Sequence, residues 1–251
     1  MGKTRWVEDA APAAPTGTHA GPAIPNLEVT YLTDPEVVAE VLPKPLEAPP
    51  EPNVHVRICD IHIQHGDFVH QERVGWFGVD AMWNGKRGEY PLLIPIDLEP
   101  ALAISREKFG EPKKLADIEL SREGDHVRGS ITRQGVTFIE IIGDVAEKLP
   151  TPEPYENTQF WFKFLPAAVG TGLDAGPFLV TLDQVRTHQS RERVDGKLEL
   201  RDLPGCPVID LPILETVSIF WSVRSAANTY NFHGEVGDPE DFARRVAIQY
   251  K

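Results

Sequence analysis

Two adjacent lysines, Lys113 and Lys114, are the residues of this sequence best suited to covalent chemistry. A lysine amine attacks a carbonyl only when it is neutral, and in water it is protonated, with a pKa of about 10.4. Burial or a neighbouring cation disfavours the ammonium and makes the amine a nucleophile. The pair follows Gly110 and Pro112, which interrupt regular structure, and it precedes the apolar Leu115. We therefore expect both lysines where a loop enters a strand.

A solvated surface pair is the alternative interpretation, because lysine is rarely buried without a partner. Successive side chains of a strand point to opposite faces, so only one of the two lysines can enter a given interior. Glu111 would share a strand face with Lys113, and its carboxylate would stabilise the ammonium form unless it accepts the lysine proton. Glu111 is therefore a candidate pocket residue and proton shuttle.

Composition limits the classes of function. The 251 residues are 41% hydrophobic and 25% charged, which suffices for a real core. The net charge of −13 argues against nucleic acid or an anionic membrane as a partner. Cys59 and Cys206 have no disulfide or metal spacing, which favours a reduced, cytoplasmic protein. We expect neither a membrane span nor a secretory signal, because no apolar run approaches the required length.

Strand patterns dominate the chain. Residues 1–26 are rich in Ala, Pro, Gly and Thr and are expected to form a flexible N-terminal arm, with one domain over residues 27–251. Alternating or apolar-rich stretches predict about ten strands. They are 27–31, 54–63, 74–83, 90–96, a meander over 118–142, 160–165, 178–185, 194–200 and 216–223. Because strands follow strands, we expect antiparallel pairing.

Local signals place the helices and turns. Asp34 and Asp238 each precede a proline and an acidic residue, which predicts two capped helices. A third helix should begin at Pro100 and end at Gly110. Asn84-Gly85 predicts a hairpin turn, and Asp195-Gly196 predicts another.

The apolar residues of the 54–63 strand change parity after Ile58, which predicts a bulge. Together these elements predict an α+β, mostly β fold, with a single antiparallel barrel-like sheet and a few peripheral short helices.

The segment around the lysines resembles the acetoacetate decarboxylase superfamily. The residues that carry the resemblance are Glu99-Pro100-Ala101, Arg106-Glu107 and Pro112-Lys113-Lys114, with weaker matches at Tyr31–Asp34, Leu42–Glu47, Asn84–Tyr90 and Cys206–Pro212. The match spans roughly residues 27 to 225 and is strongest over 84–116. It implies an acetoacetate decarboxylase-like β-barrel, a small keto acid as substrate, no cofactor and a homo-oligomer.

The resemblance also implies roles for single residues. Lys113 would be the Schiff-base lysine and Lys114 its neighbour. Glu72 is the best candidate for the family's catalytic glutamate, although it needs a two-residue shift relative to the hairpin. Arg106 and Glu107 are expected to form an ion pair in the pocket wall.

Three positions depart from the family's pattern. The stretch Ala23-Ile24-Pro25 has no arginine where the family's decarboxylases carry one that helps to hold the substrate carboxylate. Cys59 stands near the place of a second family glutamate, unless Asp60 replaces it. Glu111 stands where an aromatic or apolar residue is common. These departures weaken the assignment to acetoacetate decarboxylation more than the assignment to a Schiff-base lysine enzyme.

Four functions remain open at the level of sequence. The first is a Schiff-base lyase that decarboxylates a β-keto acid, because a lysine iminium accepts the electrons released when CO2 leaves. The second is a lysine-dependent aldolase or dehydratase acting on a keto acid such as pyruvate. The third is a non-catalytic barrel that binds a small molecule. The fourth is a metal-dependent enzyme, although the spacing of its possible ligands fits no strand or helix motif. Those ligands are Asp60, His62, His65, Asp67, His70 and Glu72.

Overall fold

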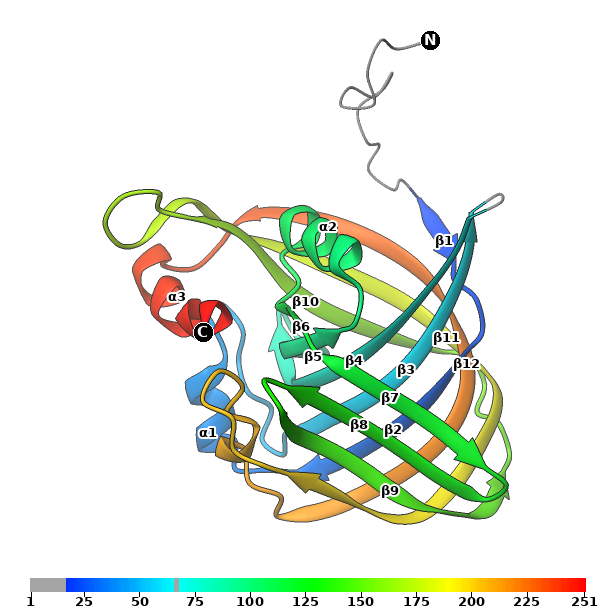
Figure 1. Ribbon diagram of the computed structural model, residues 1–251. Helices are drawn as coiled ribbons and strands as arrows, with labels where there is room; N and C mark the ends of the chain where they lie inside the picture. The colour runs from blue at the N-terminus through cyan, green and yellow to red at the C-terminus, as the bar shows by residue number, and fades with distance from the viewer. Residues whose placement is uncertain (1–16, 66–67) are drawn as a thin grey trace.

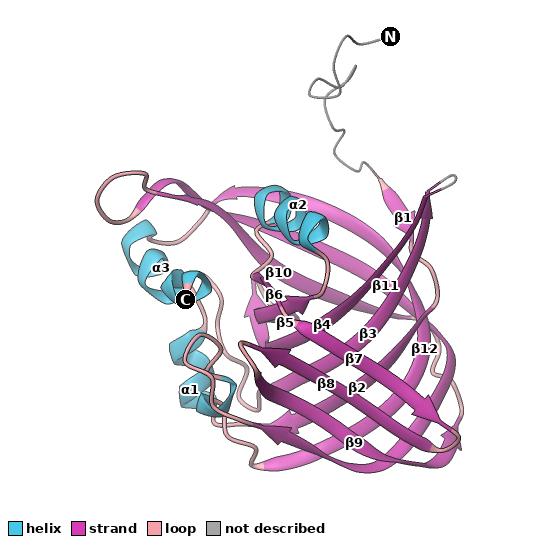
Figure 2. Ribbon diagram, viewed as in Figure 1, coloured by secondary structure: helices cyan, strands magenta, loops and turns pink. Residues whose placement is uncertain are grey.

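The computed structural model describes residues 17–65 and 68–251, without the side chains of residues 63–70 (Figures 1 and 2). Its strands are β1 (Thr18–Ala20), β2 (Ile24–Leu32), β3 (Asn53–His65), β4 (Phe68–Trp83), β5 (Lys86–Ile96), β6 (Lys113–Leu115), β7 (Asp117–Glu123), β8 (His126–Arg133), β9 (Val136–Leu149), β10 (Tyr155–Pro166), β11 (Leu173–Leu200) and β12 (Glu215–Glu235). Its helices are α1 (Pro35–Val41), α2 (Glu99–Phe109) and α3 (Pro239–Val246), with short 3-10 helices η1 (Val208–Asp210) and η2 (Ala247–Tyr250). The predicted mostly β fold with short peripheral helices is confirmed.

Seven of the strands close into a ring. The pairs run from β2 through β3, β4, β5, β10, β11 and β12, and β12 pairs again with β2. All of these pairs are antiparallel except β5 with β10, which meet at Glu89 and Gln159. A ring of this size has an interior just wide enough for side chains or one small ligand.

Two ionic contacts identify the inner face of the ring. Arg57 on β3 contacts Glu89 on β5, although β4 lies between these strands. Arg186 on β11 reaches the same carboxylate across β10. Side chains converge only on the concave side of a closed sheet, so these residues lie on the inner face.

A second layer covers the outer face. The last third of the 28-residue β11 pairs with β9 and so extends the sheet through β8 to β7. This extension folds over β2 and β3 in front of the ring (Figure 1). A Cβ at Gly129 of β8 would lie 2.8 Å from Ile58 and 3.3 Å from Leu27, so glycine allows the two layers to pack closely. The main hydrophobic core fills the space between them.

The helices close one side of the molecule. Val38 of α1 and Phe242 and Val246 of α3 belong to the main core, and the two helices lie close together beside the sheet (Figure 2). Helix α2 lies apart from them, and its Phe109 packs with Trp161 on the ring.

Most of the local signals are confirmed. Asp34 and Asp238 each accept a hydrogen bond from the backbone N–H two residues later, as helix caps do. Gly110 ends α2 with φ of 79°. Asn84 and Gly85 both have positive φ at the β4–β5 turn, which matches the turn type that their sequence predicts.

Two predictions about β3 and β11 were wrong. β3 pairs with β4 from Val54 to His65 without a register shift, so it has no bulge there. Its apolar parity changes because pairing with β2 ends at Cys59 and the strand continues with β4 alone. Asp195-Gly196 forms no turn, because β11 passes through it while paired to Asp144 and Gly143.

Glycine at position 196 serves a close approach. A Cβ there would lie 2.4 Å from the carbonyl oxygen of Ile142 on β9.

At the other end of the chain, residues 18–20 and 24–26 are strand where a flexible arm was expected. Residues 1–16 of that predicted arm lie outside the described part of the chain.

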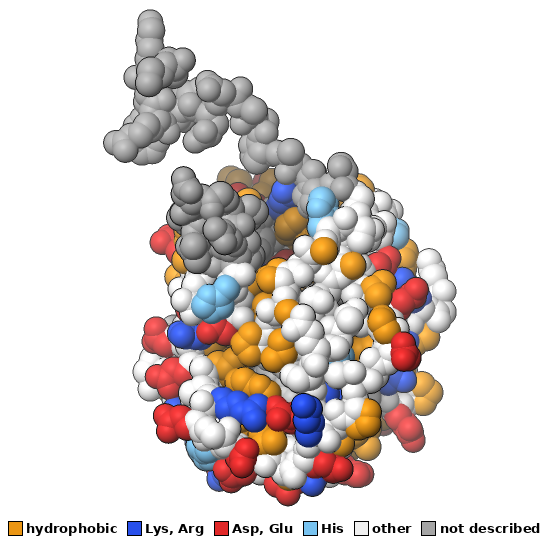
Figure 3. Space-filling view, turned by 90° about the vertical axis from the view of Figure 1, so that its right-hand side faces the viewer, with side chains coloured by type: hydrophobic (Ala, Val, Ile, Leu, Met, Phe, Trp, Pro, Cys, Tyr) orange, Lys and Arg blue, Asp and Glu red, His pale blue; other side chains and the backbone are white. Residues whose placement is uncertain are grey.

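The outer surface mixes charges of both signs. Acidic and basic side chains lie side by side along the lower part of one face, with hydrophobic side chains above them (Figure 3). The net charge of −13 is therefore not gathered into a single acidic patch on this face. Within residues 17–65 and 68–251, no helix has the length and apolar character needed to cross a membrane.

Asp80 on β4 ties neighbouring strands together inside the protein. Its carboxylate accepts bonds from the backbone and side chain of Asn53, at 2.9 and 3.0 Å, and from Arg87 at 2.6 Å, and it contacts His55 Nε2 at 3.0 Å. Burial favours the protonated acid, but the contacts with His55 and Arg87 outweigh burial and hold the pKa of Asp80 below its ordinary value.

We expect Asp80→Asn to lower the free energy of unfolding at pH 7 by about 2 kcal/mol, because the donors lose a charged acceptor. The folded carboxyl has the lower pKa, so its stabilisation is present above the unfolded pKa and is lost as the pH falls through the folded value. The difference between wild type and variant should narrow below about pH 4 in urea unfolding curves. A difference that stays constant down to pH 3 would contradict this account.

Candidate active site

The turn after α2 delivers Lys113 to the ring. Gly110 lies so close to β10 that a Cβ there would approach the carbonyl oxygen of Phe162 to 2.2 Å. β6 then runs parallel to β5, with Lys113 beside Ile94. Arg106 in the last turn of α2 donates to the backbone carbonyl of Lys113 at 2.9 Å. A helix end and a strand edge therefore fix the backbone of this lysine from two sides.

The Lys113 amino group is buried between a hydroxyl and a carboxylate. The residue is 7% exposed. Its Nζ donates to Ser105 Oγ at 2.9 Å and lies 3.2 Å from Glu111 Oε2. The expectation that Glu111 and Lys113 share a face is confirmed by this ion pair.

Strand register places Lys113 on the inner face. Lys113 lies beside Ile94, and Ile96, two residues further along β5, pairs with Val74 on β4. Side chains two residues apart on a strand share a face, and so do paired residues on adjacent strands. Trp76, two residues from Val74, stacks on the inner-face Arg57 with 4.6 Å from the guanidinium to the ring.

The same register argument places Glu72. It lies two residues before Val74 on β4, so it belongs to the inner face with Lys113. Glu72 is 8% exposed. Its position is compatible with the predicted catalytic role, which stays a prediction.

Lys114 points away from this interior. Its Nζ donates to the backbone carbonyls of Gly205, Ile248 and Lys251 at 2.6, 2.7 and 3.1 Å. Burial lowers the pKa of Lys114. The two lysines therefore separate as strand geometry requires, and the contacts of Lys114 hold the C-terminal turn η2 to β6.

An aromatic cluster lies on the inner side near Glu111. The Phe109 ring of α2 stacks on Tyr230 of β12 at 4.7 Å and lies 5.9 Å from Trp161 of β10. Burial, with a smaller contribution from the Glu111 charge, raises the pKa of Tyr230 to about 12. The tyrosine is therefore neutral at ordinary pH and belongs to an apolar wall near the Glu111 carboxylate.

A groove of about 410 Å3 opens at this end of the ring. The predicted pocket residues Arg106, Glu107 and Glu111 all line it, together with Phe164 and Tyr250. Glu111 therefore lies between the groove, which it lines, and the buried amino group of Lys113, which it contacts.

The prediction of an ion pair between Arg106 and Glu107 was wrong. Arg106 instead donates to the Lys113 carbonyl and lies 5.4 Å from the Tyr250 ring. Adjacent residues of a helix do not face each other, so the two side chains diverge.

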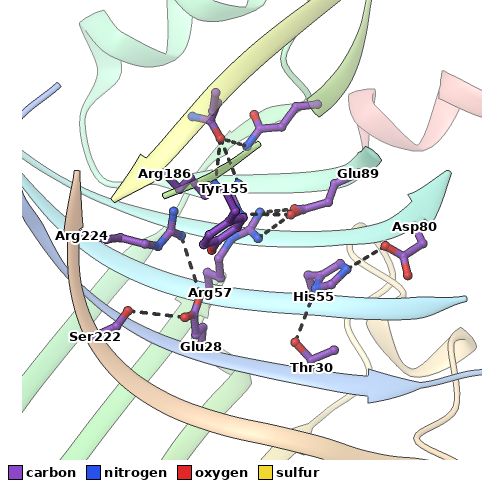
Figure 4. Close-up of polar contacts among 12 residues, drawn as sticks. Glu28, Thr30, His55, Arg57, Asp80, Glu89, Tyr155, Arg186, Ser222 and Arg224 are labelled. Carbon is purple, nitrogen blue, oxygen red and sulfur yellow. Dashed lines mark hydrogen bonds and ion pairs between the residues drawn. The ribbon is translucent and has the colours of Figure 1, made fainter. Parts of the chain in front are cut away.

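Deeper in the ring lies an ionic cluster that sequence analysis missed. It consists of Glu28, Arg57, Glu89, Arg186 and Arg224, all buried or half-buried on inner faces (Figure 4). Arg57 Nη1 and Arg186 Nη1 lie 3.0 and 3.3 Å from the same Glu89 oxygen. Burial opposes ionisation of Glu89, but the two arginines hold its pKa well below the usual range.

Burial also lowers the pKa of Arg186 to about 10, and nearby Arg224 and Arg57 act in the same direction while Glu89 opposes them. In the sequence these residues alternate with apolar ones, as on the solvated face of a strand. Only ring closure turns that polar face inward, so no local signal identified the cluster.

The possible metal ligands are only partly described. Asp60 and His62 lie 3.2 Å apart near the surface. The side chains of His65, Asp67 and His70 lie outside the described residues, and among the described ones no group of three His, Cys, Asp or Glu side chains could hold a metal ion. The metal hypothesis is therefore not tested.

Comparison with known proteins connects this geometry to a family. The family model for acetoacetate decarboxylase (ADC) matches residues 4–232. The acetoacetate decarboxylase of Burkholderia cenocepacia is 30% identical over 222 residues, which cover 82% of this chain and 84% of that protein.

Solved structures share the fold. A structure from structural studies of acetoacetate decarboxylase has a TM-score of 0.76 at 22% identity and covers 88% of this chain and 91% of its own. The enduracididine biosynthesis enzyme MppR, solved with the condensation product of pyruvate and imidazole 4-carboxaldehyde, has a TM-score of 0.71 at 16% identity, and 93% of each chain is covered. At these identities the likeness establishes the fold.

We expect Lys114→Met to loosen the chain end, because the three backbone carbonyls of Gly205, Ile248 and Lys251 lose a charged donor. The free energy of unfolding should fall by about 2 kcal/mol. Hydrogen exchange of residues 247–251 should accelerate, as measured by mass spectrometry. The exposed Lys148→Met is the matched control and should leave exchange unchanged. Unaltered protection of the chain end in Lys114→Met would show that these contacts contribute little.

Proposed function

The chain belongs to the acetoacetate decarboxylase family, and we propose that it decarboxylates a β-keto acid through an iminium formed on Lys113. As a member of this family it is an acetoacetate decarboxylase-like carbon–carbon lyase that acts on a small keto acid. The observation that carries the finer proposal is the buried Lys113 amine, which has one carboxylate at 3.2 Å and one hydroxyl at 2.9 Å.

The two contacts of Lys113 suit the first chemical step. Glu111 accepts a proton from the ammonium, and the neutral amine attacks the ketone carbon. Ser105 holds the amine in place and donates to the oxygen that leaves as water. A protonated carboxyl at this distance supplies the proton which that departure requires. The product is an iminium on Lys113.

The iminium then serves as the electron acceptor. The bond between the α-carbon and the carboxylate breaks, CO2 leaves, and the electron pair moves through the enamine to the lysine nitrogen. A proton is added to the carbon, and water hydrolyses the resulting iminium to a ketone and the free amine. Glu111 is the favoured proton donor because it touches Lys113, and Glu72 on the same inner face is the second candidate.

Aldol condensation or dehydration with a keto acid is the second candidate function. It uses the same lysine, because an enamine on Lys113 can attack an aldehyde as well as a proton. This alternative is supported by the fold shared with MppR, whose structure was solved with the condensation product of pyruvate and imidazole 4-carboxaldehyde. Incubation with β-keto acid alone, followed by CO2 detection, distinguishes decarboxylation from aldehyde-dependent product formation with pyruvate. We also propose, from the sequence, that the protein is cytoplasmic and forms a homo-oligomer.

We expect acetoacetate and cyanoborohydride to add a stable mass to Lys113, mapped by peptide mass spectrometry. Lys113→Ala should abolish both the adduct and CO2 release, since Lys113 is the lysine whose amino group contacts Glu111 in the described part of the chain. Lys197→Ala, at an exposed lysine of β11, is the control and should label like wild type. A wild-type protein without any adduct would support the non-catalytic binding barrel instead.

We expect Glu111→Gln to lower kcat for decarboxylation by about 100-fold, the scale of a lost general acid–base group. The amide keeps the shape of the side chain but cannot exchange a proton with Lys113. Glu119→Gln, at an exposed position of β7, should stay within about twofold of wild type. The measurement is the initial rate of CO2 release across substrate concentrations. An unchanged kcat in Glu111→Gln would move the shuttle role to Glu72.

A further inference from the structure

The ionic cluster inside the ring carries an excess of positive charge. Its three arginines, Arg57, Arg186 and Arg224, face two glutamates, Glu28 and Glu89. A buried charge without a counter-charge is costly unless an anion compensates it. The charge balance of this cluster therefore favours binding of one anion.

Three titratable groups near the cluster, His188, Cys59 and Glu111, do not supply that negative charge. Burial lowers the pKa of His188, which keeps the imidazole neutral at ordinary pH. Burial also raises the pKa of the Cys59 thiol, which keeps it protonated. Glu111 at the mouth of the ring is already paired with Lys113.

Of the three arginines in the cluster, Arg224 makes the fewest hydrogen bonds and ion pairs with other described residues. Arg57 and Arg186 both bind Glu89, whereas Arg224 Nη2 lies 3.7 Å from Glu28 Oε2, beyond hydrogen-bond distance. Arg224 is 8% exposed, and its Nε has no hydrogen-bond partner. The neighbouring His188 Nδ1 is buried and lacks a partner as well. Figure 4 shows the Arg224 guanidinium directed toward Glu28 and Arg57.

Strand register places Arg224 and Lys113 on the same inner face. Arg224 is two residues from Ser222 on β12, Ser222 pairs with Asn26 on β2, and Asn26 pairs with Cys59 on β3. Cys59 pairs with Val74, and Val74 pairs with Ile96. Ile96 is two residues from the neighbour of Lys113 on β5. Arg224 on β12 and Lys113 beside β5 therefore lie on opposite walls of the ring, on the same inner face, and the interior between them is narrow.

We propose that Arg224 binds the carboxylate of the keto-acid substrate while Lys113 holds its ketone; this inference rests on the proposed function. Arg224 lies directly opposite Ile24 across the β2–β12 pair. Ile24 belongs to the stretch that lacks the arginine expected from the family resemblance. The guanidinium would thus come from the neighbouring strand on the same inner face, and its free Nε and a terminal N–H can form a two-pronged bond to a carboxylate.

This role predicts an effect on binding more than on the chemical step. The carboxylate carries its full charge in the bound substrate and loses it as CO2 departs. An arginine that binds it stabilises the substrate at least as much as the transition state. Replacement of Arg224 therefore raises KM for the keto acid and changes kcat little, whereas a structural defect would lower kcat as well.

The test compares a keto acid with a neutral ketone in Arg224→Gln. Cyanoborohydride trapping on Lys113 at low concentrations of acetoacetate should slow by about 10- to 100-fold, the scale of a bond to a charged group. Trapping of acetone, which has no carboxylate, should stay within about twofold of wild type. Arg193→Gln, at a partly exposed arginine of β11, is the control. Equal losses for both probes, or no loss for either, would overturn the proposal.

A second probe separates this proposal from the proposed function. 3-Hydroxybutyrate has the carboxylate but no ketone, so its binding by calorimetry does not depend on an imine. Lys113→Ala should still bind it, and Arg224→Gln should bind it about 10- to 100-fold more weakly. If wild type labels with neither trapping probe, the proposed function fails and this measurement alone decides the role of Arg224.

Arg224→Lys covers the case in which the glutamine variant does not fold. Lysine keeps the charge but loses the planar fork, so 3-hydroxybutyrate should bind more weakly than in wild type. Wild-type affinity in a folded Arg224→Lys and an unchanged KM would overturn the proposal.

Discussion

Closure of the sheet is the constraint on which the rest of this structure depends. β12 pairs with β11 on one side and with β2 on the other, and this double pairing converts an open sheet into a ring. Ring closure turns the polar side of each strand inward, where water cannot solvate it freely. Charges that would be ordinary on an open sheet must then find partners within a narrow interior, as Arg57 and Glu89 do.

The same closure gives the two adjacent lysines different surroundings and different roles. Lys113 follows the inner face and meets Glu111 and Ser105, whereas Lys114 follows the outer face and holds the chain end through three carbonyls. Reactivity and anchoring thus come from one dipeptide because a strand alternates its side chains. The anchoring contacts in turn keep η2 beside the groove that Glu111 lines.

Much of the site near the lysines could be predicted because its signals are local. The end of α2 at Gly110 and the shared face of Glu111 and Lys113 both depend only on residues that are adjacent in the sequence. The ionic cluster could not be predicted, because Glu28, Arg186 and Arg224 come from strands far apart in sequence. The prediction of a turn at Asp195-Gly196 was wrong for a related reason. Gly196 is a glycine because β9 lies too close for a Cβ, and the dipeptide alone does not distinguish this close packing from a hairpin turn.

The sequence by itself determined the strand-rich fold, the helix caps, the family resemblance and the opposite directions of Lys113 and Lys114, because these depend on residue type and on alternation along one segment. Only the tertiary structure decided which face of each strand is interior. A polar strand face is the same pattern whether it meets water or the inside of a ring. The difference arises from the pairing of β12 with β2, which joins residues about two hundred positions apart.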